Sequence, residues 1–196
     1  MTIIMEGGRK RKKADFYPTP LEFCKATVSN LIPTDCSPAF ICDPGAGDGV
    51  WGEALRERFK DAYLIGVELE REDFPIVYNQ WHTIDYLNHH GLYGKYDLII
   101  GNPPYSLAEE FIRHSLDLLS DSGYLIFLLR WSFLESQSRG RGLWKEFPPK
   151  ELNVCVSRIS FTGDGKTDDQ AYGVYVWQKN FIGKPTFDWF DWKLMG

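Results

Sequence analysis

The sequence lacks the features that would place it in a membrane, outside the cell or around a metal ion. No apolar run approaches the roughly 20 residues that a membrane-spanning helix needs. The N-terminus carries its charges after a very short apolar stretch, unlike a secretory signal. The cysteines are scattered and form no CxxC pair, which favours reduced thiols. We therefore expect a cytoplasmic protein without a metal site.

The charge is acidic overall but unevenly placed. The formal net charge is −5, yet residues 9–13 are all basic, which leaves 17 basic against 27 acidic residues elsewhere. A basic arm on an acidic body suits contact with a phosphate backbone. A solvated terminus without a partner is the alternative. We expect residues 1–15 to form a flexible basic arm whose candidate nucleic-acid contacts are Arg9, Lys10, Arg11, Lys12 and Lys13.

Short apolar runs alternate with amphipathic ones along most of the chain. A length of 196 residues with 43% hydrophobic content is enough for one domain with a full core. Alternating strands and helices predict an α/β fold with a doubly wound, mostly parallel sheet covered on both faces. The expected strands are 39–43, 63–68, 81–85, 96–100 and 124–130, and the expected helices are 50–59 and 106–120.

The end of the chain follows another pattern. The runs 152–161 and 171–179 are strand-like and are joined by a polar loop without a helix, which predicts an antiparallel hairpin closing a seven-stranded sheet. Residues 132–150 form a polar connection long enough to be functional, with Arg139 and Arg141 as candidate nucleic-acid contacts. No linker separates a second domain, so we expect residues 16–196 to form a single domain.

The loops after the strands are the places to look for a site, because ligands of doubly wound sheets bind outside the carboxyl ends of the strands. After the first strand comes DPGAGDG, residues 43–49, in which Gly45 and Gly47 allow a tight turn. A dinucleotide fingerprint would need a third glycine where Val50 stands. The carboxylate of Asp43 suits a cationic ligand instead, and a plain strand-to-helix turn is the alternative.

Acidic residues follow the next two strands. Glu68 lies about 20 residues beyond the glycines, where a carboxylate accepts hydrogen bonds from both hydroxyls of a ribose. Its alternative is a surface acid in the run ELERED. Asp85 follows the third strand and suits an exocyclic amine, although a surface role is equally compatible with the sequence.

After the fourth strand comes Asn102-Pro103-Pro104-Tyr105. The two prolines fix the backbone, so the Asn102 side chain and the Pro103 carbonyl become rigid acceptors, while Tyr105 offers a flat ring. The lone pair of an aromatic amine such as adenine N6 is delocalised. Two acceptors bonded to its two hydrogens favour a pyramidal nitrogen, whose lone pair is then available for nucleophilic attack. They also stabilise the positive charge that develops on the nitrogen in the transition state. The ring suits a flipped-out base, and a proline-rich surface turn is the alternative.

These motifs together resemble the NPPY-type amino-methyltransferases of the class I S-adenosylmethionine-dependent fold, and in particular the DNA N6-adenine methyltransferases. The resemblance covers YPTP (17–20), DPGAGDG, the acids after the second and third strands, NPPY and the closing hairpin. It implies S-adenosyl-L-methionine as cofactor and methyl transfer to adenine N6 in DNA by direct attack of the amine. By analogy with such enzymes, it also implies the cytoplasm of a bacterial or phage-infected host cell.

The resemblance also implies roles for individual residues. The catalytic group is Asn102, Pro103, Pro104 and Tyr105, with the amine held by Asn102 and the Pro103 carbonyl and the base stacked on Tyr105. The cofactor-binding residues are Tyr17, Thr19, Pro20, Asp43, Pro44, Gly45, Gly47, Glu68, Asp85 and Asn102. From the residues themselves, Thr19-Pro20-Leu21-Glu22 predicts a helix with Thr19 as N-cap, and its N-terminus favours an anion such as the methionine carboxylate.

Two departures from the family affect what is expected. Pro44 stands where the family often has an aromatic residue, and no target-recognition domain follows the hairpin. Target selectivity must then come from the basic arm, from the 132–150 connection, from a partner chain or a dimer, or be low.

The same sequence motifs are also compatible with several alternative functions. RNA adenine and protein glutamine are acceptors for the same chemistry, and a silent nucleic-acid-binding subunit on the same fold is the alternative without catalysis. Cytosine C5 chemistry would need a cysteine that the PPY loop lacks, and cytosine N4 enzymes more often carry serine at the position of Asn102. A nicotinamide-dependent oxidoreductase is disfavoured by Val50 and by NPPY.

Overall fold

The computed structural model describes residues 18–71, 73, 75–91, 95–162, 166–167 and 169–195. Tyr17 and the five basic residues 9–13 lie outside the described residues. The elements are α1 (Leu21–Asn30), β1 (Phe40–Pro44), α2 (Val50–Arg58), β2 (Tyr63–Glu68), β3 (Gln80–Thr83), η1 (Tyr86–Asn88), β4 (Tyr96–Gly101), η2 (Tyr105–Leu107), α3 (Ala108–Leu118), β5 (Leu119–Arg130), η3 (Trp131–Leu134), α4 (Gln137–Arg141), α5 (Leu143–Glu146), β6 (Glu151–Cys155), β7 (Tyr172–Gln178) and β8 (Thr186–Phe190).

The strands form one mixed sheet in the order β3-β2-β1-β4-β5-β7-β6-β8. The first five strands in this order run parallel, and β7 is antiparallel to both β5 and β6. The predicted α/β sheet and its closing antiparallel pair are confirmed. The carboxyl ends of β1, β2, β3 and β4 consequently meet at one edge.

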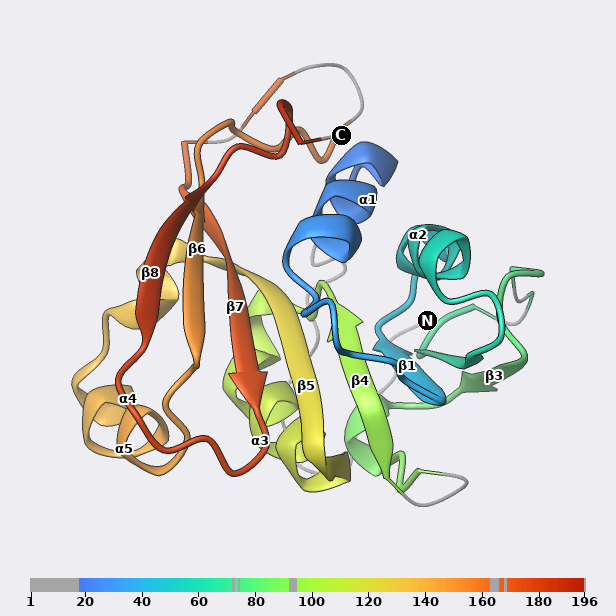
Figure 1. The fold of residues 1–196 in the computed structure, drawn as a ribbon, viewed down its shortest axis with the longest axis horizontal. Coiled ribbons are helices and arrows are strands. Elements are labelled where there is room, and N and C mark those ends of the chain that lie inside the picture. The colour runs from blue at the N-terminus through green and yellow to red at the C-terminus, as the bar shows by residue number, and fades with distance from the viewer. Residues whose placement is uncertain are drawn as a thin grey trace.

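Helices cover both faces of the sheet (Figure 1). Alternate strand residues point to opposite faces. Ile41, Leu98 and Ile126 pack in the core beneath α1 and α2, whereas Ile99 and Leu125 pack in the core beneath α3. Strands β1, β2 and β4 and residues 123–129 of β5 are therefore buried on both sides, as their nearly continuous apolar runs predicted, whereas the edge strand β3 is only partly buried. Within the described part of the chain, no helix is long and apolar enough to cross a membrane.

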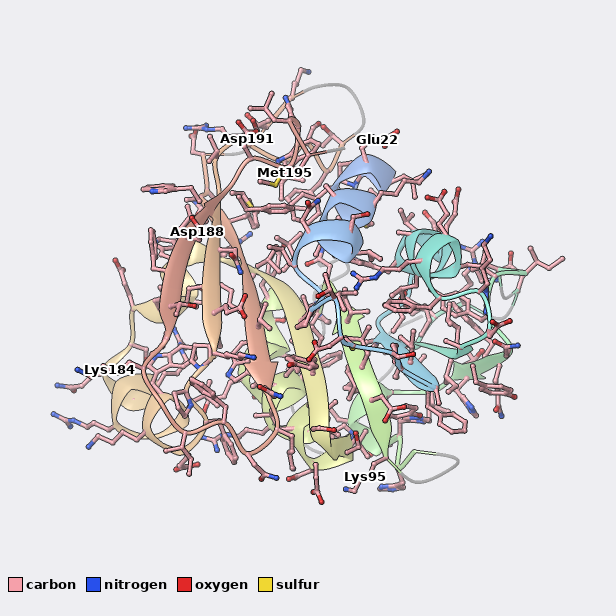
Figure 2. The ribbon with its side chains drawn as sticks, in the orientation of Figure 1. Glu22, Lys95, Lys184, Asp188, Asp191 and Met195 are labelled. Carbon is pink, nitrogen blue, oxygen red and sulfur yellow. The ribbon has the colours of Figure 1, made fainter. Side chains whose placement is uncertain are left out.

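The sheet has an eighth strand that the sequence reading missed. Strand β8 pairs in parallel with β6 at the edge of the sheet, and only its last residue, Phe190, is buried. Phe190 packs edge-on against Phe23 of α1 at a ring-centroid distance of 5.9 Å, and Trp192 does so at 5.7 Å. The tail after β8, with Asp191 and Met195 labelled in Figure 2, thus returns to α1. The predicted seven-stranded sheet is extended by one edge strand.

Helix α3 begins two residues later than the expected helix 106–120, at whose start Ser106 and Glu109 have the Ser-x-x-Glu spacing of a capping box. The N-cap of α3 is Leu107 rather than Ser106, and the short 3₁₀ helix η2 precedes it. The reason is local: the Leu107 N–H donates to the carbonyl of Pro104 at 2.9 Å, so the turn begins inside the proline pair. The prolines, and not a Ser-x-x-Glu pair, set the entry to this helix.

A group of buried rings lies on the α3 side of the sheet. His89 is 3% exposed, and its Nε2 lies 2.6 Å from the hydroxyl of Tyr96. The ring of His82 lies 5.2 Å from that of His89, and the His114 ring nitrogen contacts the His89 carbonyl at 2.8 Å. Burial, and then the neighbouring histidines, lower the pKa of His89 to about 4. His89 is therefore neutral in the folded protein at physiological pH.

This arrangement predicts a stability loss in mild acid. The unfolded chain takes up a proton on His89 below about pH 6.5, whereas the folded protein does so only near pH 4, so stability falls as the pH falls through that window. Relative to a His89→Gln variant, the wild type should lose about 2 kcal/mol of unfolding free energy between pH 8 and pH 5. Urea unfolding at each pH measures this difference.

The comparison between variants is needed because another group titrates in the opposite sense. Burial raises the pKa of Asp43 to about 7, which stabilises the fold as the pH falls and is common to both proteins. His90→Gln at an exposed neighbouring position is the control and should keep most of the wild-type pH dependence, because His90 is the smallest of the contributions that lower the pKa of His89. A constant difference between wild type and His89→Gln across the pH range would contradict the prediction.

Candidate active site

Two loops from neighbouring strands meet at the carboxyl edge of the sheet. Strands β1 and β4 are parallel neighbours, so the glycine loop after β1 and the NPPY loop after β4 leave the sheet side by side. A Cβ atom placed on Gly101 would lie 3.0 Å from Oδ1 of Asp43, and one placed on Gly45 would lie 4.0 Å from Cδ of Pro104. The structure thus brings the two principal motifs into direct contact.

The glycine loop adopts a conformation that other residues would find strained. Gly45, Gly47 and Gly49 have φ angles of +71°, +53° and +82°, all in the left-handed region. The N–H groups of Gly45 and Ala46 donate to the Val67 carbonyl at 2.7 and 3.1 Å. The turn therefore folds over the end of β2 before α2 begins.

Asp43 is a buried carboxylate at the end of β1. It is 1% exposed, and its Oδ2 accepts a hydrogen bond of 2.6 Å from the hydroxyl of Tyr78. Burial raises the pKa of Asp43 to about 7; the Tyr78 hydrogen bond lowers it and Glu68 raises it. No described residue hydrogen-bonds to its Oδ1. A buried acceptor without a partner at this edge fits a ligand that donates a hydrogen bond or carries a positive charge.

Glu68 is tied to the glycine loop rather than exposed in a charged run. It is 8% exposed; its Oε2 accepts from the Gly47 N–H at 3.0 Å and its Oε1 from the Leu69 N–H at 2.8 Å. The alternative of a surface acid is therefore wrong. The carboxylate is fixed across the turn, and ribose binding by it remains a prediction.

Asp85 lies two residues after β3 and caps the short helix η1. Its Oδ1 accepts a hydrogen bond of 3.1 Å from the Leu87 N–H. The side chain therefore has a local structural role, and its contact with the adenine of a cofactor remains a prediction.

The NPPY loop is held by the segment before α1. Nδ2 of Asn102 donates to Oγ1 of Thr19 at 3.2 Å, and Thr19 is 7% exposed. With its NH₂ group directed at Thr19, the Asn102 amide turns its oxygen the other way. Pro103 and Pro104 are buried. The hydroxyl of Thr19 therefore orients the amide at the centre of the predicted site.

This contact corrects the role expected for Thr19 at α1. The N-cap of α1 is Pro20, without a side-chain cap, and the Pro20 carbonyl accepts from the Cys24 N–H at 3.1 Å. The expected N-cap was wrong because proline itself takes the extended conformation before the helix, with ψ of 138°. Thr19, one residue earlier, is left to face the NPPY loop.

The ring of Tyr105 lies next to another aromatic ring and a guanidinium group. Its ring centroid lies 5.8 Å from that of Tyr172, and the guanidinium carbon of Arg130 lies 5.0 Å from the Tyr105 centroid. Arg130 and Tyr172 are cross-strand partners in the β5–β7 pair. The predicted stacking residue is thus only half-buried and held in place, and stacking of a base on it remains a prediction.

The two candidate arginines of the 132–150 connection belong to the short helix α4. Nε of Arg139 donates to the Phe133 carbonyl at 2.8 Å, and its guanidinium lies over the Phe133 ring at 4.3 Å. Helices α4 and α5 lie toward the end of the sheet where β6 begins, the same end that Lys95 marks before β4 (Figures 1 and 2). The guanidinium of Arg139 is thus held by Phe133, Arg141 is exposed, and the contact of either residue with nucleic acid stays a prediction.

Sequence reading missed Tyr78, Arg130 and Tyr172. Tyr78 lies in the connection between β2 and β3, where no motif marks it. Arg130 had a signal, because it is the charged last residue of a buried run that ends at the carboxyl edge. Tyr172 opens the partner strand and becomes visible only through the register of β5 with β7.

Comparison with known proteins places this geometry in context. No protein-family model matches the sequence. The chain is similar to the type II methyltransferase M.VspI of Vibrio sp. (strain 343), with 29% identity in an alignment of length 164 that covers 66% of this chain and 40% of M.VspI. The match therefore spans well under half of that relative.

Solved structures give the same fold. A Listeria monocytogenes protein classed as a class I S-adenosylmethionine-dependent methyltransferase matches with a TM-score of 0.67 and 14% identity over 95% of this chain and 69% of that one. The M protein of the type I restriction enzyme EcoKI matches with a TM-score of 0.63 and 14% identity over 90% of this chain and 49% of that one. The chain thus has the fold of the class I S-adenosylmethionine-dependent methyltransferases and is similar in sequence to the type II methyltransferase M.VspI.

Proposed function

We propose that this chain is an S-adenosylmethionine-dependent methyltransferase whose acceptor is the N6 amine of adenine in DNA. The observation that carries the proposal is the contact between the glycine loop and the NPPY loop, in which Gly101 lies against Asp43 and Pro104 faces Gly45. A methyl donor and a planar amine must meet in one cavity, and these are the two loops that would hold them.

The residues at this edge fit the cofactor. Asp43 Oδ1 is buried without a hydrogen-bond partner among the described residues, which suits a ligand with an ammonium and a sulfonium group. Asp43, Gly45 and Gly47 would border its methionine part, Glu68 its ribose and Asp85 its adenine. Thr19, Pro20 and Tyr17 would lie near its carboxylate. When bound, the cofactor supplies an electrophilic methyl group.

The NPPY loop would activate the amine. The side-chain oxygen of Asn102 and the carbonyl of Pro103 accept its two N–H groups, which favours a pyramidal nitrogen with an available lone pair. The nitrogen would bond to the methyl carbon as the sulfur–methyl bond breaks and the thioether product leaves, and the two oxygens would stabilise the positive charge that develops on the nitrogen. A proton then leaves the nitrogen to water, so the chain needs no poised general base. Tyr105 would hold the flipped base by stacking.

DNA is the favoured substrate because of the proteins that share this fold or sequence. One is a type II methyltransferase and another is the M protein of a type I restriction enzyme. Fold alone does not decide the acceptor, so RNA adenine and protein glutamine are the competing substrates. The matches span 40% of M.VspI and 49% of the EcoKI M protein. Target recognition by a partner chain or a dimer is a separate part of the proposal.

Transfer of labelled methyl groups tests the proposal. The protein is incubated with S-adenosylmethionine labelled at the methyl carbon and with unmethylated duplex DNA, single-stranded DNA, RNA or a protein mixture. Mass spectrometry of digested products should find label in N6-methyladenine from DNA. Label confined to RNA or protein would overturn the substrate assignment, and binding of nucleic acid without transfer to any acceptor would favour the silent subunit.

A further inference from the structure

Tyr78 reaches Asp43 through a space that three glycines leave open. Its ring is 5% exposed, and Cβ atoms placed on Gly49, Gly52 and Gly66 would lie 3.2, 2.5 and 3.3 Å from its ring atoms. Gly52 is on α2 and Gly66 is on β2. The ring is therefore wedged between a helix and a strand, with its hydroxyl aimed at the end of β1.

The two oxygens of Asp43 have different surroundings. Oδ2 accepts the Tyr78 hydroxyl at 2.6 Å, and Oδ1 lies on the side of Gly101, at the start of the NPPY loop. A carboxylate that is held through one oxygen cannot rotate without losing that hydrogen bond. The hydrogen bond from Tyr78 thus fixes the orientation of the carboxylate, with Oδ1 toward the carboxyl end of β4.

We propose that Tyr78 is a positioning residue of the cofactor site, whose hydroxyl fixes Asp43 with Oδ1 toward β4 and stabilises the charged carboxylate that attracts a cationic ligand. The inference rests on the proposed function, because it takes S-adenosylmethionine as the ligand near Asp43. It adds a group that contacts neither cofactor nor acceptor and acts only through Asp43.

The charges around Asp43 support a pH-dependent role. The titratable groups that interact with it are Tyr78, Glu68 from β2, Cys24 from α1 and the adjacent Cys42 of β1. Burial raises the pKa of Asp43 to about 7, Tyr78 lowers it and Glu68 raises it. Burial, and then the charge of Asp43, raise the pKa of Tyr78 well above its usual value, so its hydroxyl stays a donor. Loss of that hydroxyl should therefore move the ionisation of Asp43 to higher pH.

The test is the pH profile of ligand binding in Tyr78→Phe. Calorimetric titration with S-adenosylmethionine and with S-adenosylhomocysteine is carried out from pH 5.5 to 9 on the wild type and on the variant. Losing a hydrogen bond to a charged group shifts its ionisation by about one pH unit, so the midpoint for Asp43 should rise by about that much in the variant. The variant should then bind S-adenosylmethionine about fivefold more weakly at pH 7 and almost equally at pH 9.

The ligand's own amino group has a pKa of about 8 and titrates in the same range. Dividing the dissociation constant of the variant by that of the wild type at each pH cancels this contribution, because it is the same for both proteins. Because the homocysteine product lacks the sulfonium, a smaller ratio for that ligand would show that Asp43 responds to the sulfonium charge. If the ratio is the same for S-adenosylmethionine and S-adenosylhomocysteine, the weaker binding of the variant is due to the ammonium group that both ligands carry. Either result supports the positioning of a cation by Asp43.

Tyr124→Phe is the matched control. Tyr124 is also buried, and its hydroxyl accepts a hydrogen bond from Lys150 at 3.5 Å, away from Asp43. This control should show the wild-type profile. As a measure that needs no ligand, difference infrared titration of the Asp43 carboxyl should give a higher midpoint in Tyr78→Phe.

The outcomes separate this inference from the proposed function. A wild type that binds neither ligand at any pH overturns the proposed function. A wild type that binds, together with a Tyr78→Phe variant weakened by the same factor at every pH and with an unchanged carboxyl titration, overturns the inference alone and leaves Tyr78 as a packing residue.

Discussion

Replacing Asn102 with alanine should lower kcat for methyl transfer about 100- to 1,000-fold while changing the affinity for S-adenosylmethionine little. The amide oxygen is one of two acceptors proposed to stabilise charge that develops only in the transition state, and removal of one such group costs about that factor. The loss should therefore appear in kcat rather than in cofactor binding. Single-turnover transfer to adenine in DNA and calorimetric titration of the cofactor measure the two quantities.

The structure also offers a control for this substitution. Asn88 is an exposed asparagine in η1, and Asn88→Ala should retain wild-type kcat. Asn102→Ala leaves the hydroxyl of Thr19 without its donor, so thermal unfolding must show that the variant is folded before its rate is compared. A folded Asn102→Ala variant with wild-type kcat would contradict the role proposed for NPPY.

The main elements of the fold were predictable because their signals are local. The run 63–68 is β2 with the same bounds, and the expected helix 50–59 is α2 with one residue fewer. Buried parallel strands are short apolar runs that few other structures tolerate. The glycine loop was predictable for a similar reason, since three left-handed φ angles in five residues require glycine.

The missed features depend on contacts between distant parts of the chain. Strand β8 is mostly exposed, and its parallel pairing with β6 is not encoded in its own pattern. Thr19 was assigned to a helix cap because nothing local indicates Asn102, 83 positions later, as the partner of its hydroxyl. The pairing of Tyr78 with Asp43 likewise joins a loop to a strand 35 positions away. Such pairs follow from the assembled sheet rather than from the spacing of residues.

Gly101 gives a second large prediction, because it lies where the two motifs touch. Its Cβ position is 3.0 Å from Asp43 Oδ1, 3.3 Å from the Pro44 carbonyl oxygen and 3.4 Å from Pro44 Cδ. Valine is well tolerated in buried strands, so Gly101→Val should keep the sheet. Its added methyl groups must instead push the end of β1 away from the NPPY loop, at a cost of about 1–3 kcal/mol. We expect cofactor affinity and kcat/KM each to fall up to about 100-fold.

Gly140→Val separates this effect from a general cost of replacing glycine. Gly140 lies in α4, and a Cβ atom there would meet nothing within 4 Å. This control should bind the cofactor and transfer methyl groups like the wild type. Because Asn102→Ala is expected to spare cofactor binding and Gly101→Val to impair it, the pair distinguishes activation of the amine from the spacing of the two loops. If Gly101→Val folds, binds and transfers normally, the loops after β1 and β4 do not share the reacting cavity.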